Sequence, residues 1–302
     1  GVYHTNPKLF YIPKQNRLGM YNDEFGDALY MIEERAASGH GGLESFGKSN
    51  KVISTDDLLK NLRKDKDYLV DEKAYIRARL FDLLIGDWDR HADQWRWAEF
   101  KKDEKTIYRP VPRDRDQAFS NYDGLILTTL TRLIPSVRLM QTFDKEIRSI
   151  KWFSDEPYPL DLAFIQSSGQ KEWLEQADFI KRHLTDEKID KAFAEIPEEV
   201  NDATIEKIKT ILKYRKAQLA VTAKKYSDHL NKFVTLKGTD KDDWFEVQHL
   251  PNRKTEISYF NMKNKKKAKL IRRNVYDAKA TKEIWIYGLD DDDHFEISGR
   301  NV

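Results

Sequence analysis

Two short segments concentrate the side chains that could do chemistry. Residues 84–95 read Leu-Ile-Gly-Asp-Trp-Asp-Arg-His-Ala-Asp-Gln-Trp, which places three acids, an arginine and a histidine in one turn. Residues 112–119 read Pro-Arg-Asp-Arg-Asp-Gln-Ala-Phe and add two acids about twenty residues later. If the intervening chain folds back on itself, the acids of both segments meet, and a bound divalent cation would offset their charge.

The donor types indicate which metal and which reaction such a site would serve. The chain has no cysteine, which excludes thiolate metal sites, thiol nucleophiles and disulfides. Carboxylate and amide oxygens suit Mg²⁺ or Mn²⁺ better than Zn²⁺. In phosphoryl transfer one carboxylate accepts a hydroxyl proton and another holds the metal that bridges the phosphates. The acidic loop, the hairpin and the second acidic segment follow one another along the chain in the same order as the corresponding parts of a kinase.

The Asp89-Arg90-His91 triplet resembles the catalytic loop of atypical kinase-like families, in which this loop has the sequence Asp-x-His. These are the HipA toxin kinases, the CotH spore-coat kinases, the secretory-pathway casein kinases and, more remotely, the phosphoinositide kinases. The resemblance covers roughly residues 25–235. It implies an ATP-dependent kinase in which Asp89 is the catalytic acid or base and Arg90 and His91 shape the loop.

The same resemblance implies the groups that would hold the cofactors. Asp116 corresponds to the metal-binding Asp that opens the activation segment, with Asp114 as the close contender, and Gln94 stands where the HipA pattern has a metal-binding Asn. Glu33 and Glu34 end a segment that looks like the Glu-ended strand of the CotH pattern, and are expected on the nucleotide side. Mg²⁺ or Mn²⁺ with ATP are the implied cofactors.

A phosphate-binding lysine is not expected on a strand before Glu33, because the early lysines are Lys8 and Lys14. Without that cation the phosphates lose a charge contact worth about 2 kcal/mol, roughly thirtyfold in affinity. We therefore expect the chain to bind ATP weakly or not at all, and expect the missing lysine upstream of Gly1.

The order of motifs along the whole chain also looks like the middle region of large envelope proteins of the Bacteroidetes type. In those proteins a calcineurin-like phosphatase domain can precede this region and a BamA-like outer-membrane barrel can follow it. This resemblance implies a location in the cell envelope, and as partners the other domains of a longer parent chain.

Composition limits the remaining function classes. The 302 residues carry 53 Lys and Arg against 51 Asp and Glu, so the basic excess that drives nucleic-acid binding is absent. No apolar run approaches the roughly 20 residues of a membrane helix. We expect a nucleotide as partner, with no nucleic acid and no membrane span in this segment.

The pattern of elements predicts an α+β fold. Residues 8–13 and 28–34 are typical of strands, Ser54 and Asp71 of helix N-caps, Gly86 of a helix end, and 94–112 of a hairpin. Helices dominate 145–234, the longest over 203–233. The expected domains are an N-lobe remnant and linker (1–53), a kinase-like helical C-lobe with the catalytic-loop hairpin (54–236) and a small β module (237–302).

Three further expectations follow. The carboxylates of Asp89 and Asp116 should face one cleft within roughly 10 Å of each other. The strand over 283–287 is apolar on both faces, so we expect both faces to be covered, with the module docked on the C-lobe. The acidic turn 290–293 should lie in solvent and contribute no catalytic group.

Two alternatives to an active phosphotransferase stay open at this point. The acids of 87–93 could form an ion-paired surface turn with their neighbouring arginines. The chain could also be a degenerate kinase-like fold without turnover, serving as a non-catalytic binding or spacer domain of a larger envelope protein.

Overall fold

The computed structural model describes residues 1–38, 46–122 and 133–300. The helices are α1 (Asn22–Phe25), α2 (Thr55–Lys64), α3 (Glu72–Ile85), α5 (Ile150–Phe153), α6 (Tyr158–Phe164), α7 (Gln170–His183), α8 (Asp186–Phe193), α9 (Ala203–Ala217) and α10 (Leu219–Leu230). The strands are β1 (Lys8–Ile12), β2 (Ala28–Ile32), β3 (Val52–Ser54), β4 (Tyr68–Val70), β5 (Trp95–Lys102), β6 (Lys105–Pro112), β7 (Phe233–Lys237), β8 (Asp243–Leu250), β9 (Lys254–Lys263), β10 (Lys266–Asp277), β11 (Glu283–Tyr287) and β12 (His294–Ser298).

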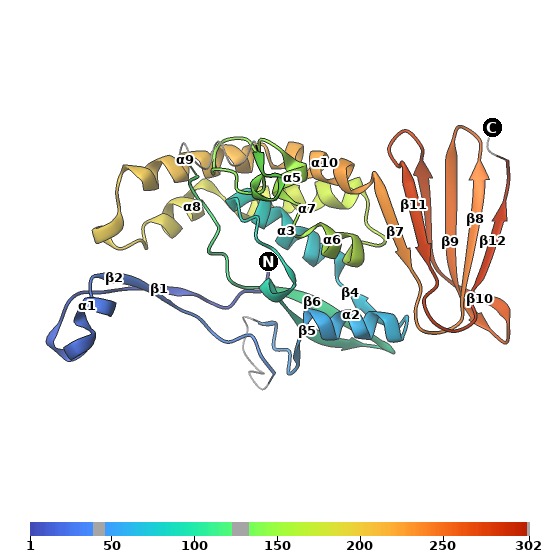
Figure 1. Ribbon diagram of the computed structural model, residues 1–302, viewed down its shortest axis with the longest axis horizontal. Helices are drawn as coiled ribbons and strands as arrows, with labels where there is room; N and C mark the ends of the chain where they lie inside the picture. Colours follow the sequence, from blue (N-terminus) through green and yellow to red (C-terminus); the bar gives the residue numbers. More distant parts are fainter. Residues whose placement is uncertain (39–45, 123–132, 301–302) are drawn as a thin grey trace.

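Helices and sheets occupy separate regions of an elongated molecule, so the α+β class is confirmed (Figure 1). A layer of helices lies over a central sheet, a strand ribbon projects at one end, and a β module occupies the other. None of the helices described is long and apolar enough to cross a membrane.

The N-terminal residues form a two-stranded antiparallel ribbon. β1 and β2 pair with Leu9 opposite Met31, which confirms the two predicted strand segments, and the ribbon extends away from the helical layer (Figure 1). Lys8 begins β1 and lies opposite Ile32, one residue before Glu33. The prediction that no lysine lies on a strand before Glu33 is therefore wrong, because strand pairing extends to the base of the ribbon.

The central sheet has the strand order β3-β5-β6-β4. β5 and β6 form the predicted hairpin, with Trp95 opposite Pro112, so the hairpin returns the chain to the place where it left the acidic loop. Ile53 pairs with Trp97, and the boundary expected at residue 53 therefore falls inside β3. On the sheet, Trp95 and Trp97 are buried in one apolar cluster with Tyr75 of α3.

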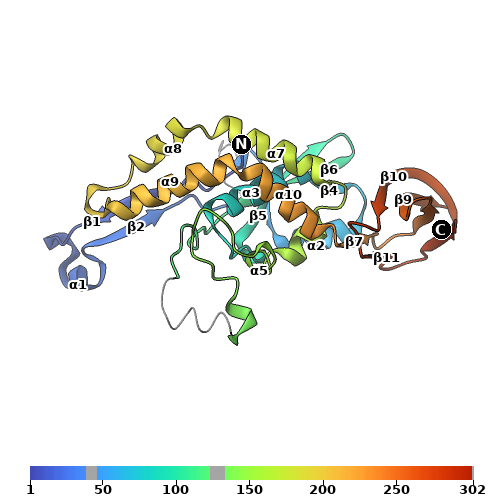
Figure 2. The ribbon, with the colours of Figure 1, turned by 90° about the horizontal axis from the view of Figure 1, so that it is seen from above.

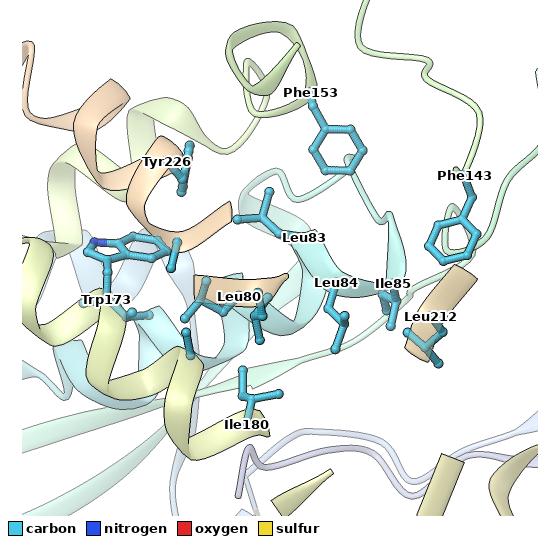
Figure 3. Close-up of a cluster of buried hydrophobic side chains, with 14 of the residues drawn as sticks. Leu80, Leu83, Leu84, Ile85, Phe143, Phe153, Trp173, Ile180, Leu212 and Tyr226 are labelled. Atoms are coloured by element: carbon cyan, nitrogen blue, oxygen red, sulfur yellow. The ribbon is translucent and has the colours of Figure 1, made fainter. Parts of the chain in front are cut away.

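α3 leads into the first acidic segment. Asp71 caps it by accepting a hydrogen bond from the N–H of Ala74 at 3.0 Å, and Gly86 ends it, both as predicted. Figure 3 shows its apolar residues inside a cluster that also includes Trp173 of α7. Burial extends around most of α3, because it contacts β6 of the sheet as well as α7 and α10.

Two helices replace the single helix predicted over 203–233. α9 ends at Ala217 and α10 begins at Leu219, because Gln218 leaves the helical conformation (φ −92°, ψ 6°). The chain changes direction between the two helices (Figure 2), and Leu212 and Leu219 lie in the same apolar cluster. From residue 233 the chain continues as β7, which pairs in parallel with β11.

The C-terminal β module docks on the rest of the chain, as expected. Its strands form a sheet in the order β10-β9-β8-β12 and the separate pair β11-β7, so the expected boundary at 236 falls inside β7. Gln166, in the loop after α6, donates to the carbonyl of Thr235 at 3.0 Å. Arg63, at the end of α2, pairs with Asp240 at 2.8 Å.

Strand β11 does not have both faces covered, so that prediction is wrong. Ile284 and Ile286 are half-buried, whereas Trp285 is 56% exposed and Tyr287 is also exposed. The reason is that β11 pairs only with β7, and within the described ranges its outer face has no other layer packed on it.

A buried acid connects the module to α2. Asp243 has no exposed surface; it lies 2.6 Å from the ammonium of Lys66 and accepts from the hydroxyl of Tyr259 at 2.9 Å. Its N–H donates to Asp293 at 2.9 Å, so the acidic turn is not wholly in solvent as expected. Burial and the charge of Asp243 raise the pKa of Asp293 to about 6.

Replacing Asp243 with alanine should lower the free energy of unfolding by about 3–5 kcal/mol, because it leaves the Lys66 ammonium buried without a counter-charge. Asp292→Ala removes an exposed pair with Lys265 and should cost less than about 1 kcal/mol. Urea unfolding of both variants measures the difference. Equal losses would contradict a buried pair at this junction.

Candidate functional site

The turn after α3 sets the direction of the loop that follows it, residues 87–94. The N–H groups of Gly86 and Asp87 both donate to the carbonyl of Asp82 at 3.0 Å. Gly86 has a φ of 82°, and a Cβ there would lie 2.7 Å from the ring of Phe143 and 3.2 Å from the guanidinium of Arg215. Glycine is therefore required for the chain to leave the helix at this point.

Asp82 is the centre of a buried network of charges. Its carboxylate lies 3.1 Å from Arg79, 3.3 Å from Arg90 and 2.9 Å from Arg115. Arg79 belongs to α3, Arg90 to the acidic loop and Arg115 to the segment after the hairpin. One carboxylate of α3 thus contacts an arginine of its own helix, one of the loop that follows, and one of the segment after the hairpin, 33 residues away.

Arg90 joins the two acidic segments directly. Its guanidinium donates to the carbonyl of Arg113 at 2.8 Å and of Asp114 at 3.3 Å on one side, and to the carbonyl of Gln94 at 2.9 Å on the other. Backbone hydrogen bonds add to this contact: for example, the N–H of Phe119 donates to the carbonyl of Ile85 at 3.0 Å. The predicted meeting of the two segments is confirmed at the level of the backbone.

A second buried carboxylate extends the network into the helical layer. Asp161 on α6 accepts from Arg79 at 3.1 Å, from the hydroxyl of Tyr75 at 2.7 Å and from the hydroxyl of Tyr226. These bonds join α3, α6 and α10. The helices that surround the loop are therefore connected by the same set of charges that positions it.

The three residues of the Asp-Arg-His motif lie in different environments. Asp89 and His91 reach solvent, with 27% and 39% of their side chains exposed, and the imidazole Nε2 is 3.9 Å from the carboxylate. His91 also accepts from the N–H of Asp93 at 3.3 Å through Nδ1. Arg90 is fully buried. Asp89 is accessible to a substrate, whereas Arg90 acts by holding the loop.

The expected metal ligands also differ in exposure. Asp114 and Asp116 lie on the surface of the second segment, and Asp116 accepts from the side chain of Gln117 at 3.2 Å. Gln94 is buried, with its amide nitrogen 3.4 Å from Nε2 of His91. The segments that carry these three residues are brought together, but only the two acids face solvent.

Glu33 and Glu34 lie at the base of the N-terminal ribbon. Thr5 donates its hydroxyl to Glu33 at 2.6 Å and its carbonyl accepts from the N–H of Glu34 at 2.8 Å. No ion pair among the residues described joins either acid to the loop. Burial and the charges of Arg113 and of the adjacent Arg35 lower the pKa of Arg96, whose guanidinium donates to the carbonyl of Asp93 in the loop at 3.1 Å.

A preformed metal site is absent from the described ranges. They contain no group of three His, Cys, Asp or Glu side chains placed to hold an ion. Mg²⁺ keeps several waters and is commonly bound by one or two carboxylates together with substrate phosphates. Asp114 and Asp116, exposed on one segment, are donors of the kind that this mode uses, whereas Gln94 is buried.

The loop also borders a hollow, which Asp89, Asp114 and Asp116 do not line. The hollow has a volume of about 470 Å³ and lies between the starts of α2 and α6. His91 and Asp93 line it from the loop, Asp56 from α2, and Glu156 from the turn before α6.

The sequence pattern did not predict the buried network of charges around Asp82. Asp82 and Arg79 sit on a helix among apolar residues, at a spacing of three that allows them to pair. Charged residues at positions that the helical pattern would bury were the available signal.

Comparison with known proteins adds no family, since no family model, curated protein or solved structure matches the chain.

Asp87 differs from the other acids of the network. One carboxylate oxygen, Oδ1, is buried and has no hydrogen-bond partner among the described residues, and Oδ2 lies 3.3 Å from Arg90. Burial and the nearby charge of Asp82 raise the pKa of Asp87 to about 7. Asp87 is therefore partly protonated near neutral pH.

The pKa of Asp87 predicts a pH dependence of stability. Because the pKa is about 7 in the folded protein and about 3.9 in an unfolded chain, the folded state binds this proton more tightly. Its contribution to stability is present at low pH and is lost as the pH rises from about 4 through 7. Relative to Asp87→Asn, the unmodified protein should lose up to about 3 kcal/mol between pH 5 and pH 8.

Urea unfolding of both proteins across this pH range provides the measurement. Asp93→Asn is the matched control, since its carboxylate is 84% exposed, and its difference from the unmodified protein should not change with pH in this way. A constant difference for Asp87→Asn would contradict the raised pKa.

Proposed function

We propose that the chain is a kinase-like domain that transfers a phosphoryl group from ATP to a hydroxyl, with Mg²⁺ or Mn²⁺. The observation that supports this most is the pair of bonds from the buried Arg90 to the carbonyls of Arg113 and Asp114. They hold the second acidic segment beside the loop that carries Asp89. A proton acceptor and metal-holding carboxylates on adjacent segments are what phosphoryl transfer requires.

Each residue then has a defined role. Asp89, which reaches solvent, accepts the proton of the attacking hydroxyl. Asp116, or Asp114, would hold the ion together with the amide oxygen of Gln94, and the bound ion would neutralise charge on the phosphates. Arg90 is a positioning residue, because it has no exposed surface.

The charge beside the loop suits an anionic nucleotide. Arg96 donates to the carbonyl of Asp93 in the loop at 3.1 Å, and burial and the charges of Arg113 and Arg35 lower its pKa. Phosphate oxygens would stabilise this positive charge. On this proposal the end of the N-terminal ribbon, next to Glu33 and Glu34, is on the nucleotide side of the site.

Asp89→Asn should reduce the transfer of labelled phosphate from ATP by about a hundredfold or more, because it removes the proton acceptor. Binding of ATP in the presence of Mn²⁺ should be unchanged in this variant and weaker in Asp116→Asn. Electron paramagnetic resonance of Mn²⁺ measures binding, with millimolar ATP because we expect weak affinity. Mn²⁺ without ATP should bind poorly.

The control is Asp93→Asn, an exposed acid on the same loop, which should keep both activities. Transfer that survives in Asp89→Asn would contradict the assigned role of this residue.

A non-catalytic domain is the second candidate. The observation in its favour is that the described chain lacks a preformed group of three metal-binding side chains. Failure to detect ATP binding or phosphate transfer by the unmodified protein would favour this candidate, which would then act as a binding or spacer domain of a larger cell-envelope protein.

A further inference from the structure

A groove lies between the segment 145–151 and the side of α10, reaching the end of α9, and it shares no lining residue with the hollow that His91 lines. Its volume is about 650 Å³. One wall is the segment 145–151, which includes the start of α5, and the other is formed by the two helices. Lys282 and Phe233 border the groove where α10 ends.

The groove is strongly cationic although the chain as a whole is nearly neutral. Seven lysine or arginine side chains line it, against two carboxylates. One of the two, Asp228, is already bonded to Lys224 at 2.7 Å and to Gln170 at 2.8 Å. The positive charge of the groove is therefore not neutralised by its own acids.

Four of the cations have no ionic partner in the parts of the chain that the structure describes. They are Arg148, Lys225, Lys232 and Lys282. Two others, Lys145 and Lys151, lie over aromatic rings. The burial of His229 and the charges of Lys232 and Lys151 lower the pKa of that imidazole, which agrees with a positive local field. An anionic ligand would satisfy these groups.

The shape of the groove indicates the kind of ligand. On α10 its lining residues include 221, 225 and 228, which recur every three or four positions, so one side of α10 faces it, and Tyr214 and Arg215 extend the lining to the end of α9. At 1.5 Å per residue the 12 residues of α10 are roughly 18 Å long. An extended peptide of about six residues spans α10, and one of about eight also reaches the end of α9.

We infer that this groove binds an extended acidic segment of a protein. The cations alternate with apolar side chains, among them Ile150, Val221 and Phe233, which suits a peptide with both acidic and apolar residues. A concave groove does not accept a flat membrane surface. A nucleic acid would require a larger basic surface than a chain of formal charge +2 offers.

Fluorescence anisotropy with a labelled eight-residue peptide of alternating glutamate and leucine tests this inference in the intact chain. Lys225→Glu combined with Lys232→Glu should weaken binding about thirtyfold or more, because two attractions become repulsions. Lys207→Glu, an exposed lysine of α9 outside the groove, should change affinity less than about threefold. Binding should also weaken as salt is added.

Thermal unfolding first confirms that all three proteins are folded. The inference is overturned if the peptide does not bind, if the double variant binds it as well as Lys207→Glu does, or if single-stranded DNA or anionic vesicles bind more tightly than the peptide at equal charge. Because the readout is binding, the result does not depend on whether the chain transfers phosphate.

Discussion

The carboxylate of Asp82, surrounded by the guanidinium groups of Arg79, Arg90 and Arg115, is the interaction on which the arrangement of the site depends. Charges removed from water must be paired closely, and breaking such a pair from one side costs about 3–5 kcal/mol. Each arginine comes from a different segment. The network therefore penalises any conformation in which the helix, the loop and the post-hairpin segment separate.

The network also separates the roles of positioning and chemistry. Asp82, Arg79 and Arg90 are buried, so they cannot touch a substrate, whereas Asp89, Asp114 and Asp116 reach solvent on the segments that the network joins. Three carboxylates, those of Asp82, Asp87 and Asp161, balance the three guanidinium groups in formal charge. Asp87 is the member with a carboxylate oxygen that has no hydrogen-bond partner among the described residues, and burial and the charge of Asp82 raise its pKa to about 7.

Local signals in the sequence predicted much of the framework. Asp71 and Gly86 marked the ends of α3, because capping and left-handed conformations depend on a few neighbouring residues. The alternating aromatic residues predicted the hairpin, and the hairpin predicted that the two acidic segments meet. The proposed roles of Asp89, Asp116 and Glu33 stay predictions, because accessibility and proximity alone do not assign chemistry.

Features that depend on tertiary packing were not predictable in the same way. The break at Gln218 lies inside an apolar pattern that a single helix would also satisfy. The exposure of Trp285 depends on which elements pack against β11. Arg79 lies at helical spacing from Asp82, but Arg115 is 33 residues away, beyond the range of any periodic pattern.

Cross-linking tests most directly whether the network brings Asp89 and Asp116 to one site. The chain has no cysteine, so Asp89→Cys combined with Asp116→Cys introduces a single reactive pair. A short bismaleimide should link this pair in the native protein and should do so much less after Arg90→Met. Asp89→Cys with Asp292→Cys is the control, since α2, about 15 Å long, lies between the loop and the module that carries residue 292. Native protein in which positions 89 and 116 do not link, or link no better than 89 and 292, would contradict the account.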